Sequence, residues 1–205
     1  MEGRSGGLGG RRSIEKGEWM DSDRKTPGDG WPPTLHGKRI GVYGMGAIGT
    51  RVARRMQGFE TEIAYFSRSA KPGLPFERFQ TLLKLAEWCD VLIACAPGGG
   101  ETFHAIDAQV IRALGTRGFL VNVGRGSVVD SAALFDALEA GTLAGAGLDV
   151  WEEEPAVSDR MKATQNLVMT NHSAGLSPEA VEATTRMASV NLIRFFKGER
   201  PLNLI

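Results

Sequence analysis

Short apolar runs alternate with segments of helical periodicity from residue 38 to about residue 170. Most of these runs are continuously hydrophobic, as strands buried on both faces require. Strands that alternate with helices predict a parallel sheet covered by helices. The expected strands are 39–44, 62–66, 90–96, 118–123, 145–150 and 167–170, and the expected helices are 47–57, 79–88, 106–114 and 131–140. The pattern therefore predicts an α/β fold with a doubly wound, mostly parallel sheet.

The two ends of the chain depart from this pattern. Residues 1–37 are rich in Gly, Asp, Arg and Pro, and within them only 11–20 could form a short helix. Near the other end, Ser177 and Pro178 supply an N-cap and a first helical residue, so a long terminal helix is expected to run to about Lys197. We therefore expect three parts, 1–37, 38–176 and 177–205.

A glycine motif follows the first expected strand directly. Gly44, Gly46 and Gly49 form G-x-G-x-x-G between that strand and a helix, which is the context of a dinucleotide-binding fingerprint. Gly44 would allow the tight turn, Gly46 the approach of a pyrophosphate, and Gly49 close packing of the helix on the strand. The N–H groups at the helix start would face the phosphates, so Ala47 and Ile48 join the expected cofactor site. A glycine turn between a core strand and a core helix is the alternative.

The end of the second expected strand bears on the choice of cofactor. In NAD-binding folds an acidic residue about 20 positions beyond the glycines bonds the ribose 2′-hydroxyl. Here that place holds Ser67, Arg68 and Ser69. A guanidinium would pair with a 2′-phosphate, and two hydroxyls could donate to it. This predicts NADP(H) as the preferred cofactor, with NAD(H) possible; an exposed arginine in an ordinary loop is the alternative.

Charge and composition exclude several classes of protein. Lys+Arg and Asp+Glu both number 24, which argues against a nucleic-acid partner. No apolar run approaches the roughly 20 residues of a membrane span, and residues 1–16 lack the apolar stretch of a signal peptide. Cys89 and Cys95 are expected to be buried apolar groups rather than a disulfide or metal pair, and no metal site is expected. A cytoplasmic protein in a reducing compartment is the expectation.

Three later segments complete a family pattern. They read VNVGRGSVVD over 121–130, GAGLDVWEEEP over 145–155 and NHSAG over 171–175. Together with the glycine loop, they closely resemble the D-isomer-specific 2-hydroxyacid dehydrogenases, from about residue 37 to the C-terminus. The segment 65–69 looks most like the NADPH-preferring glyoxylate/hydroxypyruvate reductase branch, which includes hydroxyphenylpyruvate reductases.

The resemblance implies roles for individual residues. Arg125 matches the arginine that binds the substrate carboxylate and polarises its carbonyl, His172 the general acid/base, and Glu154 the acid that hydrogen-bonds this histidine. Reduction of a 2-oxo acid forms an alkoxide, which an imidazolium can protonate at neutral pH. Asp149 matches the residue that accepts a bond from the nicotinamide carboxamide. The further positions that match the lining of the cofactor site are Pro97, Thr102 and Val123.

Each of these catalytic candidates has a simpler interpretation when taken alone. Arg125 would be a surface loop arginine, Glu154 one acid of a solvated run, and His172 a satisfied loop histidine. Their joint occurrence at strand ends, where such folds bind ligands, favours the functional interpretation. Trp151 could line the active site or serve packing. Glu152 and Glu153 are expected to be solvated acids. His36 and His104 are expected to have structural roles.

The resemblance also implies an activity and an organisation. It implies reduction of a small 2-oxo acid to the D-2-hydroxy acid with NADPH, and a homodimer formed through the cofactor domains. Residues 38–176 would be the dinucleotide-binding domain, 177–205 a helix returning toward the substrate-binding domain, and 1–37 a linker or remnant of that domain. Because the glycine loop already starts at residue 44, that half-domain is expected to be largely missing. A non-catalytic NAD(P)-binding module, or an inactive fragment that acts in protein interaction, is therefore the alternative.

One loop departs from the family pattern. Gly98, Gly99 and Gly100 stand where the family usually has larger residues. We expect that loop to be unusually mobile, which would weaken its contacts with the cofactor.

Overall fold

The computed structural model describes residues 33–203, which divide into two compact units between Met169 and Thr170. The first unit holds the sheet and the second holds the terminal helix. The helix expected at 11–20, like most of the part expected over 1–37, lies outside the described residues.

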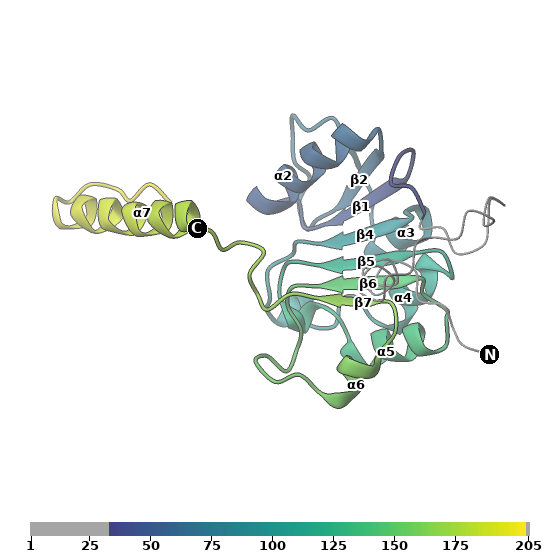
Figure 1. The fold of residues 1–205 in the computed structure, drawn as a ribbon. Helices are drawn as coiled ribbons and strands as arrows, with labels where there is room; N and C mark the ends of the chain where they lie inside the picture. The colour runs from purple at the N-terminus through teal and green to yellow at the C-terminus, as the bar shows by residue number, and fades with distance from the viewer. Residues whose placement is uncertain (1–32, 204–205) are drawn as a thin grey trace, which may run out of the picture. The chain divides into compact units, whose positions relative to one another are not determined.

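The first unit is built on a sheet of seven strands, all parallel, in the order β3-β2-β1-β4-β5-β6-β7 (Figure 1). The chain runs outward from β1 in one direction and then returns to build from β4 in the other. Ligands bind at such a switch point in open α/β sheets, at the carboxyl ends of the strands. The strands are β1 Arg39–Tyr43, β2 Glu62–Phe66, β3 Glu77–Arg78, β4 Val91–Ala94, β5 Phe119–Asn122, β6 Gly145–Leu148 and β7 Leu167–Met169. The predicted doubly wound sheet is confirmed.

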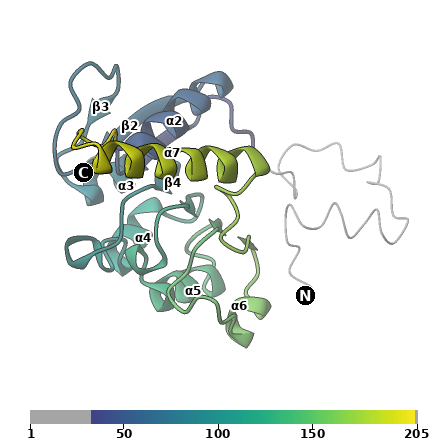
Figure 2. The same cartoon turned by 90° about the vertical axis from the view of Figure 1, so that its left-hand side faces the viewer.

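Helices of the first unit link its strands and cover the sheet, and the second unit contributes α7. The α-helices are α2 Ala47–Met56, α3 Leu82–Trp88, α4 Ala108–Leu114, α5 Ser131–Glu139, α6 Asp159–Ala163 and α7 Pro178–Phe196. Three single turns of 3₁₀ helix accompany them, namely η1 Gln57–Phe59, η2 Gly100–Thr102 and η3 Gly126–Val128. Within the first unit, α3 packs against α4, and α4 against α5 (Figure 2).

Side chains of β1 alternate between two hydrophobic clusters on opposite faces of the sheet. Ile40 and Val42 are fully buried in one cluster with Ala53 of α2. Between them, Gly41 faces α3, where an added Cβ would lie 2.8 Å from the thiol of Cys89. The larger cluster, on that second face, gathers apolar residues of α3, α4, α5 and α6. Burial on both faces explains why the strands are continuously apolar.

An ion pair fixes the amino end of β1 to its neighbour β4. The Asp90 carboxylate accepts hydrogen bonds from the backbone N–H of Arg39 at 2.9 Å and from its Nη2 at 3.2 Å, and the Asp90 N–H donates to the Arg39 carbonyl. Partial burial raises the pKa of Asp90, but the hydrogen bonds and charge of Arg39 outweigh it, so the pKa lies below its usual value. The contact therefore supports the register at the switch point.

Two predicted helix boundaries are wrong for identifiable reasons. The helix expected from 79 begins at Leu82, because Thr81 caps it and residues 77–78 pair with β2 as the edge strand β3. The helix expected from 106 begins at Ala108, because Asp107 caps it. Ile106 instead forms a bridge with Val129. The short helix α6 was not predicted at all.

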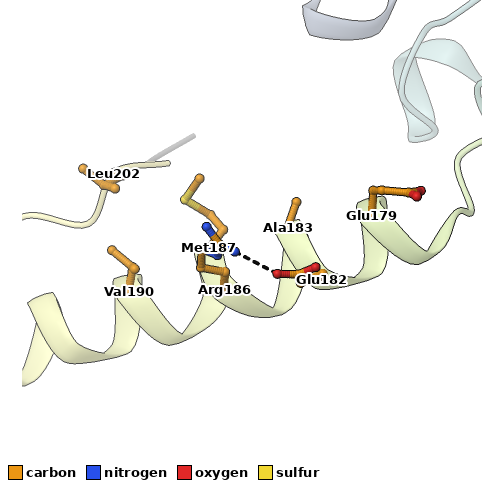
Figure 3. Close-up of a pocket in the computed structure, with 7 residues that line it drawn as sticks. All are labelled: Glu179, Glu182, Ala183, Arg186, Met187, Val190 and Leu202. Atoms are coloured by element: carbon orange, nitrogen blue, oxygen red, sulfur yellow. Dashed lines mark hydrogen bonds and ion pairs between the residues drawn. The ribbon is translucent and has the colours of Figure 1, made fainter.

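The second unit consists of the segment 170–177, α7 and a tail that folds back along this helix. Ser177 caps α7 as predicted, and after Lys197 the tail is held by bonds from Arg194 Nε to the Arg200 carbonyl and from Leu202 N–H to Asn191 Oδ1, both 2.8 Å. An open groove of about 350 Å³ lies between the helix and the tail (Figure 3). The groove is lined by Glu179, Glu182, Ala183, Arg186, Met187, Val190 and Leu202.

Apolar side chains of α7 face solvent in the single chain. Leu192, Ile193 and Phe195 are 55–65% exposed, and Phe196 is 82% exposed. Despite these residues, no helix in the span 33–203 has the length and apolar character needed to cross a bilayer.

Candidate cofactor and active site

The glycine loop after β1 has the geometry that its sequence predicts. Gly44 has φ +95°, and an added Cβ would lie 2.6 Å from the backbone nitrogen of Ala96. A Cβ on Gly49 would overlap the carbonyl of Gly44. Gly46, in contrast, is exposed, and a Cβ there would meet nothing within 4 Å. Two glycines are thus required by packing, whereas Gly46 keeps an open approach to the backbone.

The N-terminus of α2 has no side-chain cap, unlike those of the other α-helices in residues 33–203. A side chain accepts a first-turn N–H in each of α3 to α7, namely Thr81, Asp107, Asp130, Ser158 and Ser177. At α2 the N-cap is Gly46, which has no side chain to do so. Helix N-termini attract anions through their N–H groups and dipole. The exposed Ala47 and Ile48 begin this helix, so the predicted phosphate site fits the residues present.

The loop after β2 is held from its backbone side. The buried hydroxyl of Ser67 donates to the Ser69 carbonyl at 2.7 Å, and Arg78 of β3 donates to the carbonyls of Ser67 and Arg68 at 3.0–3.3 Å. We expected both serine hydroxyls to donate to a ligand, but that of Ser67 supports the loop instead. Ser69 and Arg68 are the exposed members.

A glycine-rich loop follows β4, and its contacts explain two of its three glycines. Thr102 donates to the carbonyl of Pro97 at 2.7 Å and closes the loop. A Cβ on Gly98 would lie 3.1 Å from Cγ of Arg125, and Gly99 has φ +145°, which few other residues adopt. Gly98 therefore permits close approach to Arg125 and Gly99 an unusual turn, whereas the expected mobility of the loop stays a prediction.

Asn122, which the sequence reasoning missed, builds the loop that bears Arg125. Asn122 is fully buried at the end of β5; its Nδ2 donates to the Arg125 carbonyl at 3.0 Å and its Oδ1 accepts the Gly124 N–H at 3.1 Å. Val123 N–H donates to the Ala94 carbonyl, which fixes the loop to β4. The Arg125 side chain is exposed, with Nη1 donating to the Gly124 carbonyl. The signal for Asn122 was a single amide at the end of an apolar strand.

The segment after β6 carries two predicted site residues. Asp149 is buried, and its N–H donates to the Asn122 carbonyl. The Glu154 carboxylate accepts the N–H of Trp151 at 2.8 Å, which orients it. Trp151 itself is buried in the core and donates its Nε1–H to the Ala156 carbonyl. Of the two roles considered for Trp151, packing is the one observed.

Glu152 is not the solvated acid that was expected. One of its oxygens lies 2.6 Å from Nε2 of His104, and the other accepts the N–H of Ser131. Partial burial raises the pKa of Glu152, but the bonds from His104 and Ser131 outweigh it and hold the pKa below its usual value. The pair ties the segment after β6 to the loop after β4, which is a structural role for His104, as expected.

His172 belongs to the second unit and has a left-handed backbone, with φ +56°. Residues other than glycine adopt this region uncommonly, and such conformations concentrate at functional sites. Its bond with Glu154 stays a prediction.

The other predicted site residues gather at one edge of the sheet. They follow β1, β2, β4, β5 and β6, and the carboxyl ends of parallel strands share one edge. No group of three or more His, Cys, Asp or Glu side chains within 33–203 is arranged to hold a metal ion. The residues gathered at this edge are Gly44, Gly46, Ala47, Ile48, Gly49, Ser67, Arg68, Ser69, Pro97, Thr102, Val123, Arg125, Asp149 and Glu154.

Comparisons with known proteins agree with this geometry. A glyoxylate/hydroxypyruvate reductase of Arabidopsis thaliana is 40% identical over 191 residues, and a hydroxyphenylpyruvate reductase of Plectranthus scutellarioides is 37% identical over 186. These alignments cover 93% and 91% of this chain but 58% of each relative. The chain thus spans less than two thirds of the length of the curated relatives it matches.

Solved structures give the same assignment. An NADPH-dependent glyoxylate/hydroxypyruvate reductase of Sinorhizobium meliloti, in complex with NADP and malonate, superposes with a TM-score of 0.85 at 38% identity. The match covers 95% of this chain and 60% of that one. Residues 8–174 match the model of the D-isomer specific 2-hydroxyacid dehydrogenase, NAD binding domain. The chain therefore belongs to the D-isomer-specific 2-hydroxyacid dehydrogenase family, of which it contains the NAD-binding domain.

Proposed function

We propose that this chain binds NADP(H) and serves the reduction of a small 2-oxo acid, of the glyoxylate or hydroxypyruvate type, to the D-2-hydroxy acid. The observation that supports it most is that two features occur together: Gly46, which has free space around it at an uncapped helix N-terminus, and Arg68, which is exposed after β2. The first feature suits a pyrophosphate and the second a 2′-phosphate. NAD(H) lacks the second group and is the weaker candidate.

The reduced nicotinamide supplies a hydride, and the protein supplies binding, orientation and a proton. Arg125 would bind the substrate carboxylate, because its planar fork matches two oxygens. His172 would protonate the oxygen that becomes negative, and Glu154 would orient its imidazole. Asp149 would hold the carboxamide of the cofactor. The side chain of Asn122 supports the backbone of Gly124 and Arg125 at the carboxyl edge of the sheet.

A second candidate is a non-catalytic NAD(P)-binding module, or an inactive fragment that acts in protein interaction. The chain covers 58–60% of the length of the relatives described above, and the second candidate needs only the cofactor site that this part contains. We further propose a homodimer formed by the cofactor domains, and a cytoplasmic location. The location is supported by two free thiols, Cys89 and Cys95, which suit a reducing compartment.

Titration of both cofactors tests the binding part of the proposal. NADPH should bind more tightly than NADH, and Arg68→Ala should remove roughly 1.5–3 kcal/mol of NADPH binding, or about tenfold to over a hundredfold in affinity. Equal affinities in the unmodified protein would contradict the NADP assignment. Loss of absorbance at the reduced-nicotinamide band with NADPH and glyoxylate then separates the two candidates. Turnover supports the enzyme, and binding without turnover supports the module.

A further inference from the structure

Arg68 forms an ion pair with Glu101 across the switch point of the sheet. Nη1 of Arg68 lies 2.8 Å from Oε2 of Glu101, and the two side chains are 88% and 79% exposed. Arg68 follows β2, Glu101 follows β4, and these strands flank β1 on its two sides (Figure 1). The ion pair thus joins the two loops on either side of the glycine motif.

The backbone of Arg68 is fixed without help from Glu101. Arg78 donates to the carbonyls of Ser67 and Arg68, and the Ser67 hydroxyl closes the loop onto Ser69. Glu101 therefore acts on the guanidinium and not on the path of the chain. Removing its charge should leave the loop in place.

The ion pair is weak enough to exchange for another anion. Exposed pairs gain little, because water screens them and two long side chains lose freedom. A phosphate monoester carries nearly two negative charges at neutral pH and three acceptor oxygens, and guanidinium binds it well. An anion of that kind would take Arg68 from Glu101, and the displaced carboxylate would turn to the solvent, to which it is already largely exposed.

We propose that Glu101 is a specificity-determining residue that competes with the 2′-phosphate of NADP(H) for Arg68. The inference rests on the proposed function. Glu101 lowers the affinity for NADP(H) and leaves that for NAD(H), which has no 2′-phosphate, unaltered. The selectivity of the site is thus set by two residues of opposite charge on separate loops.

Titration of NADPH and NADH into the full chain tests this with five proteins at one salt concentration. They are the unmodified chain, Glu101→Gln, Arg68→Ala, the double variant, and Glu87→Gln as a control for an exposed glutamate that pairs elsewhere, with Lys84. Glu101→Gln should bind NADPH about two- to fivefold more tightly, because NADPH no longer has to break the exposed ion pair between Arg68 and Glu101. Its affinity for NADH should not change, and neither affinity should change in Glu87→Gln.

The double variant separates competition from simple repulsion. Combined with Arg68→Ala, Glu101→Gln should no longer raise NADPH affinity; an undiminished gain overturns the proposal, because Glu101 would then act without Arg68. Unchanged or weaker NADPH binding in Glu101→Gln, with a large loss in Arg68→Ala, overturns this inference and leaves the proposed cofactor intact. If Arg68→Ala itself binds NADPH normally, both the proposed cofactor preference and this inference fail.

Discussion

The side chain of Asn122 makes hydrogen bonds to the backbone on both sides of the peptide bond that joins Gly124 to Arg125. It accepts the Gly124 N–H and donates to the Arg125 carbonyl, and it is fully buried. A buried amide in this position restricts the conformation of the loop. If the backbone moved away from it, buried polar groups would lose their hydrogen-bond partners, which costs free energy. The position of the candidate substrate-binding arginine therefore depends on a residue that would touch no substrate.

Replacing Asn122 should show this dependence. Asn122→Ala leaves two backbone groups without their partner and should lower the free energy of unfolding by about 1–3 kcal/mol. Denaturant unfolding measures it, with Gln109→Ala on the exposed side of α4 as the control. A variant as stable as the control would show that the loop does not need the amide.

Two glycines of the G-x-G-x-x-G motif after β1 should respond differently to substitution by alanine. Gly49→Ala places a Cβ on the Gly44 carbonyl and should cost about 1–3 kcal/mol of stability, as overpacking does. Gly46→Ala meets open space, so thermal unfolding should change little, but NADPH affinity should fall roughly tenfold, or ~1.4 kcal/mol. Gly58→Ala, also in open space, is the control for both measurements. Unaltered NADPH binding in Gly46→Ala would remove the cofactor from this loop.

Replacing either member of the proposed acid/base pair should lower turnover without weakening cofactor binding. Glu154→Gln should lower the turnover of glyoxylate, because the carboxylate proposed to orient His172 is then absent. His172→Ala should lose about 10²–10⁴-fold in turnover with NADPH binding nearly unchanged.

These measurements require a form of the protein that turns over glyoxylate, and Glu153→Gln is the matched control. Turnover in Glu154→Gln equal to that in Glu153→Gln means that Glu154 does not act on His172. Normal turnover in His172→Ala would make the binding-module interpretation the better one.

Acid should remove the contribution of the ion pair between β1 and β4. The pKa of Asp90 is lowered in the folded chain, so its contribution is full above the ordinary aspartate value of about 4 and is lost as the pH falls through the lowered one. Asp90→Asn should cost about 1 kcal/mol at pH 7 and progressively less in acid. Thermal unfolding from pH 7 to 3 measures this, with Glu87→Gln as the control. A difference that stays constant with pH would exclude the charge as its cause.

The exposed face of α7 should promote association. Leu192 and Phe195 are 59% and 65% exposed, and apolar patches of this kind mark contact surfaces. Sedimentation at micromolar concentration should show a dimer or a larger species, and serine at both positions should reduce the larger species. Lys197→Ser, at the exposed C-cap of the helix, is the control. A monomer at every concentration would contradict both this expectation and the proposed homodimer.

The strands and most helices could be predicted because their signals are local. The apolar period, the glycine turn and the caps each lie within a few residues, and they located the sheet, α2 and α7 closely. The edge strand β3 has two residues, too few for a period, and α6 has five. The role of Glu152 depends on His104, 48 residues away, a distance at which no sequence pattern operates. The same holds for the pairing of Arg68 with Glu101, 33 residues apart.

The all-parallel order of the sheet also sets how the chain can fold. No two adjacent strands can be joined by a tight turn, so every pairing requires a crossover. β1 gains β2 early, but its contact with β4 joins residues 51 positions apart, as Arg39 and Asp90 show. Closing such loops costs chain entropy before the contacts compensate for it. We therefore expect slower folding than for a helical bundle of this length. The pairing of β1 with β2 should form before the pairing of β1 with β4, which completes the carboxyl edge of the sheet.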